Sequence, residues 1–156
     1  MISTQVFSVH ETIGHAIERM SLQFEQRDVL MNLRLEADHY MVEADKDQML
    51  NIILNLLDNA IKYSPGRPEI TIRSSNHDQW LQISISDRGI GIRSDEQKRI
   101  FDRFYRVHTG NVHNIKGFGL GLSYVKEFLT AMGGTIEVES KKGEGSTFTV
   151  NIPFVN

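Results

Sequence analysis

One segment, residues 47–62, constrains this chain more than any other. Its apolar residues recur at the spacing of an α-helix that packs by one face, and they predict a helix here: Leu50, Ile53, Leu54, Leu57, Ala60 and Ile61. At about 100° per residue, three asparagines and a lysine share an arc of roughly 80° on the other face: Asn51, Asn55, Asn59 and Lys62. Asn is a poorer helix former than the residues of ordinary solvated faces. The face is therefore either simply solvated or a polar site, in which amide oxygens would bind a cation such as Mg²⁺ and the lysine would meet phosphate.

Size and composition narrow the class of protein. A chain of 156 residues with 40% hydrophobic and 24% charged residues is typical of one soluble globular domain. The net charge of −3 argues against a broadly basic nucleic-acid surface, and the absence of Cys excludes disulfides and thiolate metal sites. The sequence has no apolar run of membrane-spanning length and no signal peptide. We therefore expect no direct membrane contact by this chain, so that any anchor would belong to a longer parent protein.

The first third of the chain alternates between strand and helix patterns. We expect a strand, a helix and two further strands, in this order: residues 2–8, 12–26, 29–35 and 39–42. Asp45 is the expected N-cap of the central helix. His10 followed by Glu11 has the form of a phosphoacceptor, although a lone histidine is more often a surface or capping group.

The rest of the chain adds two strand pairs and two helices. The central helix should end at Ser64-Pro65-Gly66. We then expect a hairpin of strands 69–74 and 80–86 with its loop at residues 75–78, followed by a short helix over residues 94–104 capped by Ser94. A polar loop over residues 107–116 and a helix over residues 120–132, ending at Gly133-Gly134, should come next. The last expected elements are paired strands at residues 135–140 and 146–153. This order predicts an α+β two-layer sandwich, with a mixed, mostly antiparallel sheet of about five strands packed on three helices.

A first glycine cluster, Asp87-Arg88-Gly89-Ile90-Gly91, directly follows a predicted strand. Asp and Gly are default residues of tight turns, so the cluster could be purely structural. Alternatively, Asp87 would accept a hydrogen bond from a buried exocyclic amine, and the glycines would let the backbone approach a flat ring. Alone, this motif does not decide between the two interpretations.

A second cluster, GFGLGL at residues 117–122, opens a predicted helix. The unpaired N–H groups of a helix N-terminus suit phosphate. A Rossmann motif would need a preceding strand, and a P-loop would need Lys followed by Ser or Thr after the glycines, so neither matches. A glycine-hinged lid over a bound triphosphate agrees with both the polar loop before the cluster and the helix after it.

Taken together, these motifs resemble the catalytic and ATP-binding domain of a bacterial sensor histidine kinase, of the Bergerat-fold ATPase superfamily. NLLDNAIKY at residues 55–63 resembles the family's asparagine box, and residues 87–91 and 117–122 resemble its two glycine boxes. Residues 100–106 resemble its phenylalanine box, and Gly145-Ser146-x-Phe148 with Pro153 resembles its closing strand. The boxes follow the family's order over about residues 40 to 154.

The resemblance implies a role for each matching residue. Asp87 would hold the adenine amine with Ser146 assisting through water, and Tyr63 would line the nucleotide. Asn59 would bind Mg²⁺, Asn55 would support the metal or the phosphates, and the amides of residues 117–121 would cradle the phosphates. Lys62 and Arg106 would meet phosphate oxygens and, with Asn55, form the catalytic set. The remaining nucleotide-binding positions implied are Gly89, Gly91, Ile92, Gly117, Gly119, Leu120, Gly121 and Leu122.

The implied function is transfer of the γ-phosphate of Mg-ATP to a histidine in two-component signalling. The chain would be one ATP-binding domain over residues 1–156, with a flexible ATP lid at about 106–118. His10-Glu11 lacks the Pro and the hairpin partner of the family's acceptor, so the histidine would lie on a separate dimerisation and phosphoacceptor hairpin of a parent kinase. A response regulator would be the downstream partner. The chain would be cytoplasmic and its parent anchored in the inner membrane.

Three alternatives remain. Phe118 stands where many relatives carry Ser or Thr, which leaves open a nucleotide-binding module without catalysis. An anti-sigma-type serine kinase shares these boxes, although the Phe-Tyr-Arg run at residues 104–106 suits sensor kinases better. ATP hydrolases of the superfamily, such as gyrase and MutL, carry Glu where this chain has Asn55, and an amide cannot act as general base.

Overall fold

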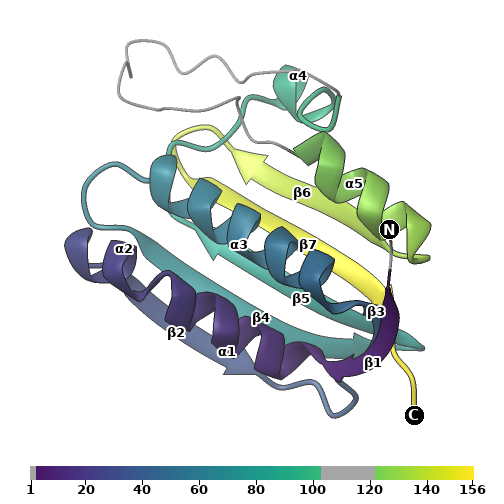
Figure 1. Cartoon of the computed structure of the whole chain (residues 1–156). Helices are drawn as coiled ribbons and strands as arrows, with labels where there is room; N and C mark the ends of the chain where they lie inside the picture. Colours follow the sequence, from purple (N-terminus) through teal and green to yellow (C-terminus); the bar gives the residue numbers. More distant parts are fainter. Residues whose placement is uncertain (1–2, 103–121) are drawn as a thin grey trace.

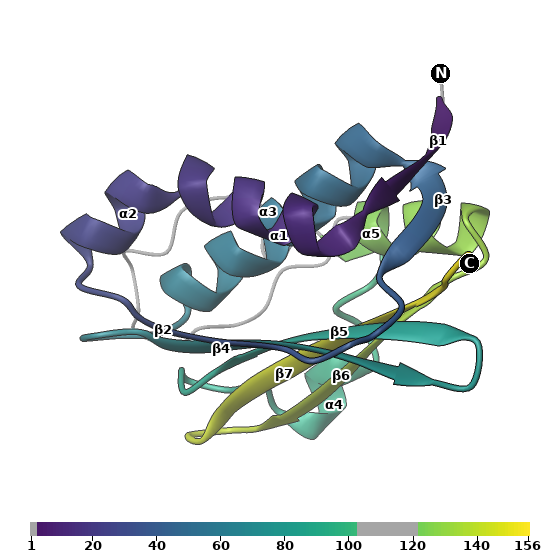
Figure 2. The same cartoon turned by 90° about the horizontal axis from the view of Figure 1, so that it is seen from below.

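A five-stranded sheet covered by helices on one face forms the body of the molecule. The computed structural model describes residues 3–102 and 122–156, and Figures 1 and 2 show α1, α2, α3 and α5 on the same side of the sheet. The strand order is β2-β4-β5-β7-β6, in which β2 and β4 are parallel and all other neighbours are antiparallel. The strands are β2 (Leu30–Leu35), β4 (Glu69–His77), β5 (Trp80–Asp87), β6 (Thr135–Lys141) and β7 (Gly145–Pro153). The predicted mixed, mostly antiparallel sheet is thus confirmed.

The period-two alternation of the strands explains why only one face is covered. In β5, Leu81, Ile83 and Ile85 are buried towards the helices, whereas the intervening Gln82, Ser84 and Ser86 are only half-buried. Helix α3 (Lys46–Lys62) supplies the opposing layer of the core with residues such as Ile53, Leu56 and Leu57. The apolar stripe of the central helix therefore lies against the sheet, as its spacing predicts.

Helix α3 begins and ends where the sequence predicts. Asp45 is its N-cap, and the Asp45 carboxylate accepts a hydrogen bond from the Gln48 amide at 3.1 Å. Tyr63 is the C-cap residue, and its amide donates to the Asn59 carbonyl at 3.0 Å. Upstream, β1 (Thr4–Ser8) and β3 (Met41–Asp45) pair antiparallel in a separate two-stranded sheet.

The helix expected at residues 12–26 is two helices, α1 (Val9–Arg19) and α2 (Ser21–Gln26). The start was predicted three residues too late, because Ser8 caps α1 by accepting a hydrogen bond from the Glu11 amide at 3.2 Å. The chain leaves helical geometry at Met20, which has φ −99° and ψ 10°. No helix among the described residues combines the length and hydropathy needed to cross a bilayer.

Two other local predictions need correction. The β4–β5 hairpin turns at Asp78 and Gln79, not over residues 75–78, because Asp78 adopts the left-handed φ of 53° and Asn76 still pairs with Leu81. Helix α4 covers only Ser94–Gln97, and Ser94 is its first residue rather than its cap. Helix α5 (Leu122–Ala131) ends as predicted, with Gly133 at φ 77° and the Gly134 amide donating to the Leu129 carbonyl at 2.7 Å.

Candidate functional site

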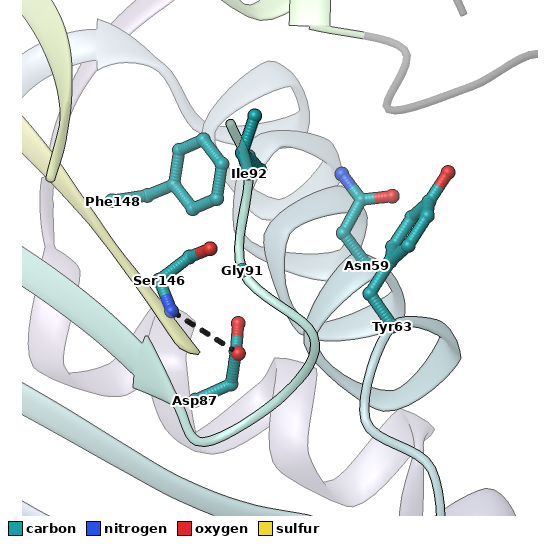
Figure 3. Close-up of a pocket in the computed structure, with 7 residues that line it drawn as sticks. All are labelled: Asn59, Tyr63, Asp87, Gly91, Ile92, Ser146 and Phe148. Atoms are coloured by element: carbon teal, nitrogen blue, oxygen red, sulfur yellow. Dashed lines mark hydrogen bonds between the residues drawn. The ribbon is translucent and has the colours of Figure 1, made fainter. Parts of the chain in front are cut away.

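A pocket opens where the C-terminal end of α3 meets the end of β5 and the start of β7. Figure 3 shows its lining side chains, which come from three distant parts of the sequence: Asn59, Tyr63, Asp87, Gly91, Ile92, Ser146 and Phe148. All of them except Phe148 are among the site residues that the sequence predicts. The site is therefore assembled where the asparagine box, the first glycine box and the closing strand converge.

Asp87 supplies the charge at the bottom of this pocket. It pairs with Ser146 across β5 and β7, and its Oδ1 accepts hydrogen bonds from the Gly89 amide at 2.8 Å and the Ser146 amide at 3.3 Å. Its other oxygen is directed into the space enclosed by the lining residues (Figure 3), and no described residue donates a hydrogen bond to it. Burial raises the pKa of Asp87 to about 6, against the opposing effect of the two amide donors. Near pH 7 the carboxylate is thus mainly ionised and offers an acceptor to a ligand.

The glycines after Asp87 are required by close packing of the protein itself. A Cβ on Gly89 would lie 2.1 Å from the Tyr63 carbonyl oxygen, and a Cβ on Gly91 would lie 2.2 Å from the Lys141 carbonyl oxygen. The Ile90 amide, between them, donates to the Tyr63 carbonyl at 2.9 Å. The turn is therefore held between the end of α3 and the β6–β7 connection, while Gly91 and Ile92 also line the pocket.

The polar face of α3 contributes its last turns to the site. Asn59 is only 7% exposed, and its Nδ2 donates to Asn55 Oδ1 at 3.1 Å. Asn55 itself is half-buried and does not line the pocket. Lys62 is ion-paired with Asp58 at 2.8 Å on the helix surface, and it too lies outside the lining.

The donor set at this helix suits a magnesium ion held jointly with phosphate. In the described part of the chain, no group of three or more His, Cys, Asp or Glu side chains could hold a metal by itself. Amide oxygens such as that of Asn59 are ligands for a hard cation, and Mg²⁺ in nucleotide sites typically takes few protein ligands beside water and phosphate oxygens. Asn59 therefore fits such an ion as a single protein ligand.

The segment after α3 is fastened by a residue far away in sequence. The Arg27 guanidinium donates to the carbonyls of Ile61 at 3.3 Å, Ser64 at 2.7 Å and Gly66 at 3.1 Å. These carbonyls flank Tyr63, whose side chain lines the pocket. Arg27 thereby supplies donors to carbonyl groups at the C-terminal end of α3, and it fixes the position of the pocket wall that contains Tyr63.

Phe148 is the lining residue that the sequence-based site prediction lacks. It follows Ser146 by two positions on β7, so both side chains lie on the same face of the strand. That alternation was the available signal. Leu122 is described but belongs to the buried core, while Arg106, Gly117, Gly119, Leu120 and Gly121 lie outside the described residues, as does the proposed lid at 106–118.

Comparison with known proteins shows the family of this chain. Residues 44–156 match the family described as histidine kinase-, DNA gyrase B-, and HSP90-like ATPases. The chain is 41% identical over 148 residues to the sensor protein RprX of Bacteroides fragilis, covering 94% of this chain and 28% of RprX. It thus spans less than a third of that relative.

Solved structures give the same fold. The catalytic domain of the histidine kinase ThkA superposes with a TM-score of 0.85 at 23% identity, covering 99% of both chains. Full-length ShkA, solved in complex with AMPPNP, gives a TM-score of 0.84 at 26% identity over all of this chain and 32% of that one. The Bergerat fold expected from the sequence is confirmed, and the chain belongs to the family of histidine kinase-, DNA gyrase B-, and HSP90-like ATPases.

Proposed function

We propose that this chain binds Mg-ATP and donates the γ-phosphoryl group to a histidine on a separate dimerisation and phosphoacceptor domain. The observation that carries the proposal is Asp87, a half-buried carboxylate with one oxygen directed into the pocket. Such an acceptor suits the exocyclic amine of adenine. The matching family and the likeness to a named sensor protein support the class of reaction.

The pocket walls suit a purine ring. Ile92 and Phe148 are both buried and apolar, and Tyr63 adds an aromatic surface on the α3 side. A flat base between such side chains would gain dispersion contacts while Asp87 binds its amine. ShkA, with the same fold, was solved with AMPPNP.

The phosphates would extend along the polar face of α3. Asn59 would bind Mg²⁺, with Asn55 supporting it through the hydrogen bond between their side chains. Bound there, the ion would neutralise charge on the phosphate oxygens. Lys62, released from Asp58, and Arg106 would bind phosphate oxygens, and the amides of residues 117–121 would cradle them, as the resemblance implies.

Asn55 favours transfer over hydrolysis. A carboxylate at this position would activate water, whereas an amide cannot take the proton. The unprotonated nitrogen of a neutral imidazole needs no such base: its lone pair attacks the γ-phosphorus, a P–N bond forms, and the bond to the bridging oxygen breaks as ADP leaves with that electron pair. The proton on the other ring nitrogen is not on the attacking atom and stays in place during this step. Phosphoryl transfer of this kind needs mainly positioning and charge neutralisation.

This function implies particular partners. The acceptor would be the helical hairpin of a parent kinase, and a response regulator would take the phosphoryl group next. The related fold of ThkA has been solved in complex with the response regulator TrrA. The role would place this chain in the cytoplasm, with the parent anchored in the inner membrane.

The first test is inorganic phosphate release from Mg-ATP by the chain alone, with ATP binding measured in parallel. We expect binding without sustained release, followed by acid-labile phosphohistidine when a phosphoacceptor hairpin is supplied in trans. Sustained release that Asn55→Ala abolishes would instead establish a hydrolase. Binding without release, and without transfer to any supplied hairpin, would favour a non-catalytic module, and transfer to a serine would favour the anti-sigma type.

A further inference from the structure

Ser140 lies behind the pocket wall and touches three groups at once. On β6 it is directly opposite Ser146 of β7. Its Oγ accepts a hydrogen bond from the Ile92 amide at 2.7 Å, donates to the Gly145 carbonyl at 2.9 Å and lies 2.7 Å from Ser146 Oγ. It does not itself line the pocket.

The direction of the bond between the two serines follows from proton counting. A hydroxyl has one proton and two lone pairs. The Gly145 carbonyl can only accept, so its contact uses the Ser140 proton, and the Ile92 amide uses one lone pair. All three contacts are hydrogen bonds together only if Ser146 donates its own proton to the remaining lone pair of Ser140.

That arrangement makes Ser146 an acceptor towards the pocket. Its proton is committed to Ser140, so the lone pairs of Ser146 Oγ are what it offers to a ligand or a bridging water. Asp87, its partner across the strands, also offers an acceptor. Where Ser146 Oγ meets the base directly, the two acceptors match the two amine protons of a 6-aminopurine and oppose the carbonyl of a 6-oxopurine.

We propose that Ser140 is a positioning residue that sets base selectivity, by holding the Ser146 hydroxyl in the acceptor orientation. The inference rests on the proposed nucleotide-binding function. It goes beyond it by placing part of the selectivity in a residue that a bound base would not touch.

A second contact provides a control. The Gln97 side-chain amide donates to the Ile92 carbonyl at 2.7 Å and to the Ser140 carbonyl at 2.8 Å. It therefore supports the same two segments through their backbone, without fixing the proton of Ser146. Loss of the Gln97 side chain should lower the affinity for every base alike, whereas loss of the Ser140 hydroxyl should change which base is preferred.

The test compares dissociation constants for Mg-ATP and Mg-ITP, which carries a carbonyl in place of the 6-amine, by calorimetry. In Ser140→Ala, Ser146 can rotate and donate to that carbonyl, so the preference for ATP should fall about five- to tenfold, the value of one hydrogen bond. Ser140→Thr keeps a hydroxyl and should retain the parental preference. Gln97→Ala should raise the dissociation constants of both nucleotides by the same factor.

A double-mutant cycle separates positioning from general damage. If Ser140 acts through Ser146, then Ser140→Ala should not alter the preference further in a Ser146→Ala background. An unchanged preference in Ser140→Ala, with ATP still bound, would overturn the inference and leave the proposed function standing. Failure of the parent chain to bind ATP would remove both.

Discussion

Asp87 is held ionised in the folded chain at a cost in stability, because burial disfavours its charged form. Its pKa is raised from 3.8 to about 6 by burial, so between these values the folded state binds more protons than the unfolded state. The free energy of unfolding therefore falls as pH rises through this window, and remains lower above it. An ionised acceptor facing the pocket is useful only if something binds there.

Replacing Asp87 with Asn should separate stability from binding. Asn keeps an Oδ1 that can accept from the Gly89 and Ser146 amides, while a neutral donor replaces the second oxygen. At pH 8 we expect Asp87→Asn to unfold with a free energy about 1–3 kcal/mol higher than the parent, and the difference should shrink towards zero near pH 4. Urea unfolding at several pH values measures this. Parallel pH profiles of the two proteins would show that Asp87 is not the titrating group.

Asp87→Asn should also remove a pH dependence of binding. Because the carboxylate must be ionised to accept from the adenine amine, parental ATP affinity should fall as pH drops below about 6. The phosphates of ATP titrate in the same range, so the Asn variant, with weak but pH-insensitive recognition of the base, gives the reference. Equal slopes for both proteins would contradict a contact between Asp87 and the amine.

The prediction for Asn59 concerns the magnesium dependence of ATP binding. Its amide lines the pocket, so Asn59→Ala should abolish the difference in ATP affinity between excess Mg²⁺ and excess chelator. Asn51→Ala is the matched control, because Asn51 lies on the same helix face but is exposed and outside the pocket. Magnesium dependence that survives in Asn59→Ala would remove Asn59 from the metal site.

At the scale of elements, the end of α3 depends on the turn after α2. Arg27 donates to the three carbonyls around Tyr63, and Arg67 donates back to the Asp28 carbonyl at 2.9 Å. Charge-assisted hydrogen bonds of this kind are the strong ones. The two segments therefore stabilise each other, and one wall of the pocket rests on their contact.

We expect Arg27→Ala to lower the free energy of unfolding by about 1–3 kcal/mol and also to weaken ATP binding, because the carbonyls lose their donor. Arg27→Lys should recover only part of both, since one ammonium group cannot reproduce the planar fork. Arg19→Ala, at an exposed position on α1, should change stability by no more than about 0.5 kcal/mol. Denaturant unfolding and calorimetry report the two effects; a loss of stability without any loss of affinity would mean that the pocket wall does not depend on Arg27.

Sequence periodicity predicted the type and extent of these helices and strands well, but it predicted the breaks and turns between them poorly. The apolar spacing of α3 and the Asp45 cap are local signals, so both ends of that helix were correct. The break at Met20 and the hairpin turn at Asp78 depend on how side chains pack and on one left-handed backbone angle, which short-range patterns do not encode. Ser140 gave no signal at all, because its importance comes from a cross-strand neighbour and from the Ile92 amide.

At the scale of the whole molecule, the pocket exists only because one core joins distant segments. Asn59 and Tyr63 lie at the end of α3, and residues 87–92 lie at the end of β5 and on the turn after it. Ser146 and Phe148 lie on β7, the strand between β5 and β6. The sequence could predict each motif, but the register that sets Asp87 against Ser146 is a property of the assembled sheet. Unfolding of the chain should therefore abolish the pocket and the fold in the same transition.

The prediction at this scale is a single cooperative unfolding transition over the whole chain, as expected for one domain. Trp80, the only tryptophan, starts β5 and pairs with Pro153, so its fluorescence reports the sheet at the end away from Asp87. Far-UV circular dichroism is dominated by the helices, and the two probes should give coincident denaturant transitions. Saturating Mg-ATP at about 100 times its dissociation constant should raise the unfolding free energy from both probes by about 2.7 kcal/mol. If Trp80 unfolded separately from the helices, or if ATP shifted only one probe, the sheet and the helical layer would be independent units, and the pocket between them could not depend on a common core.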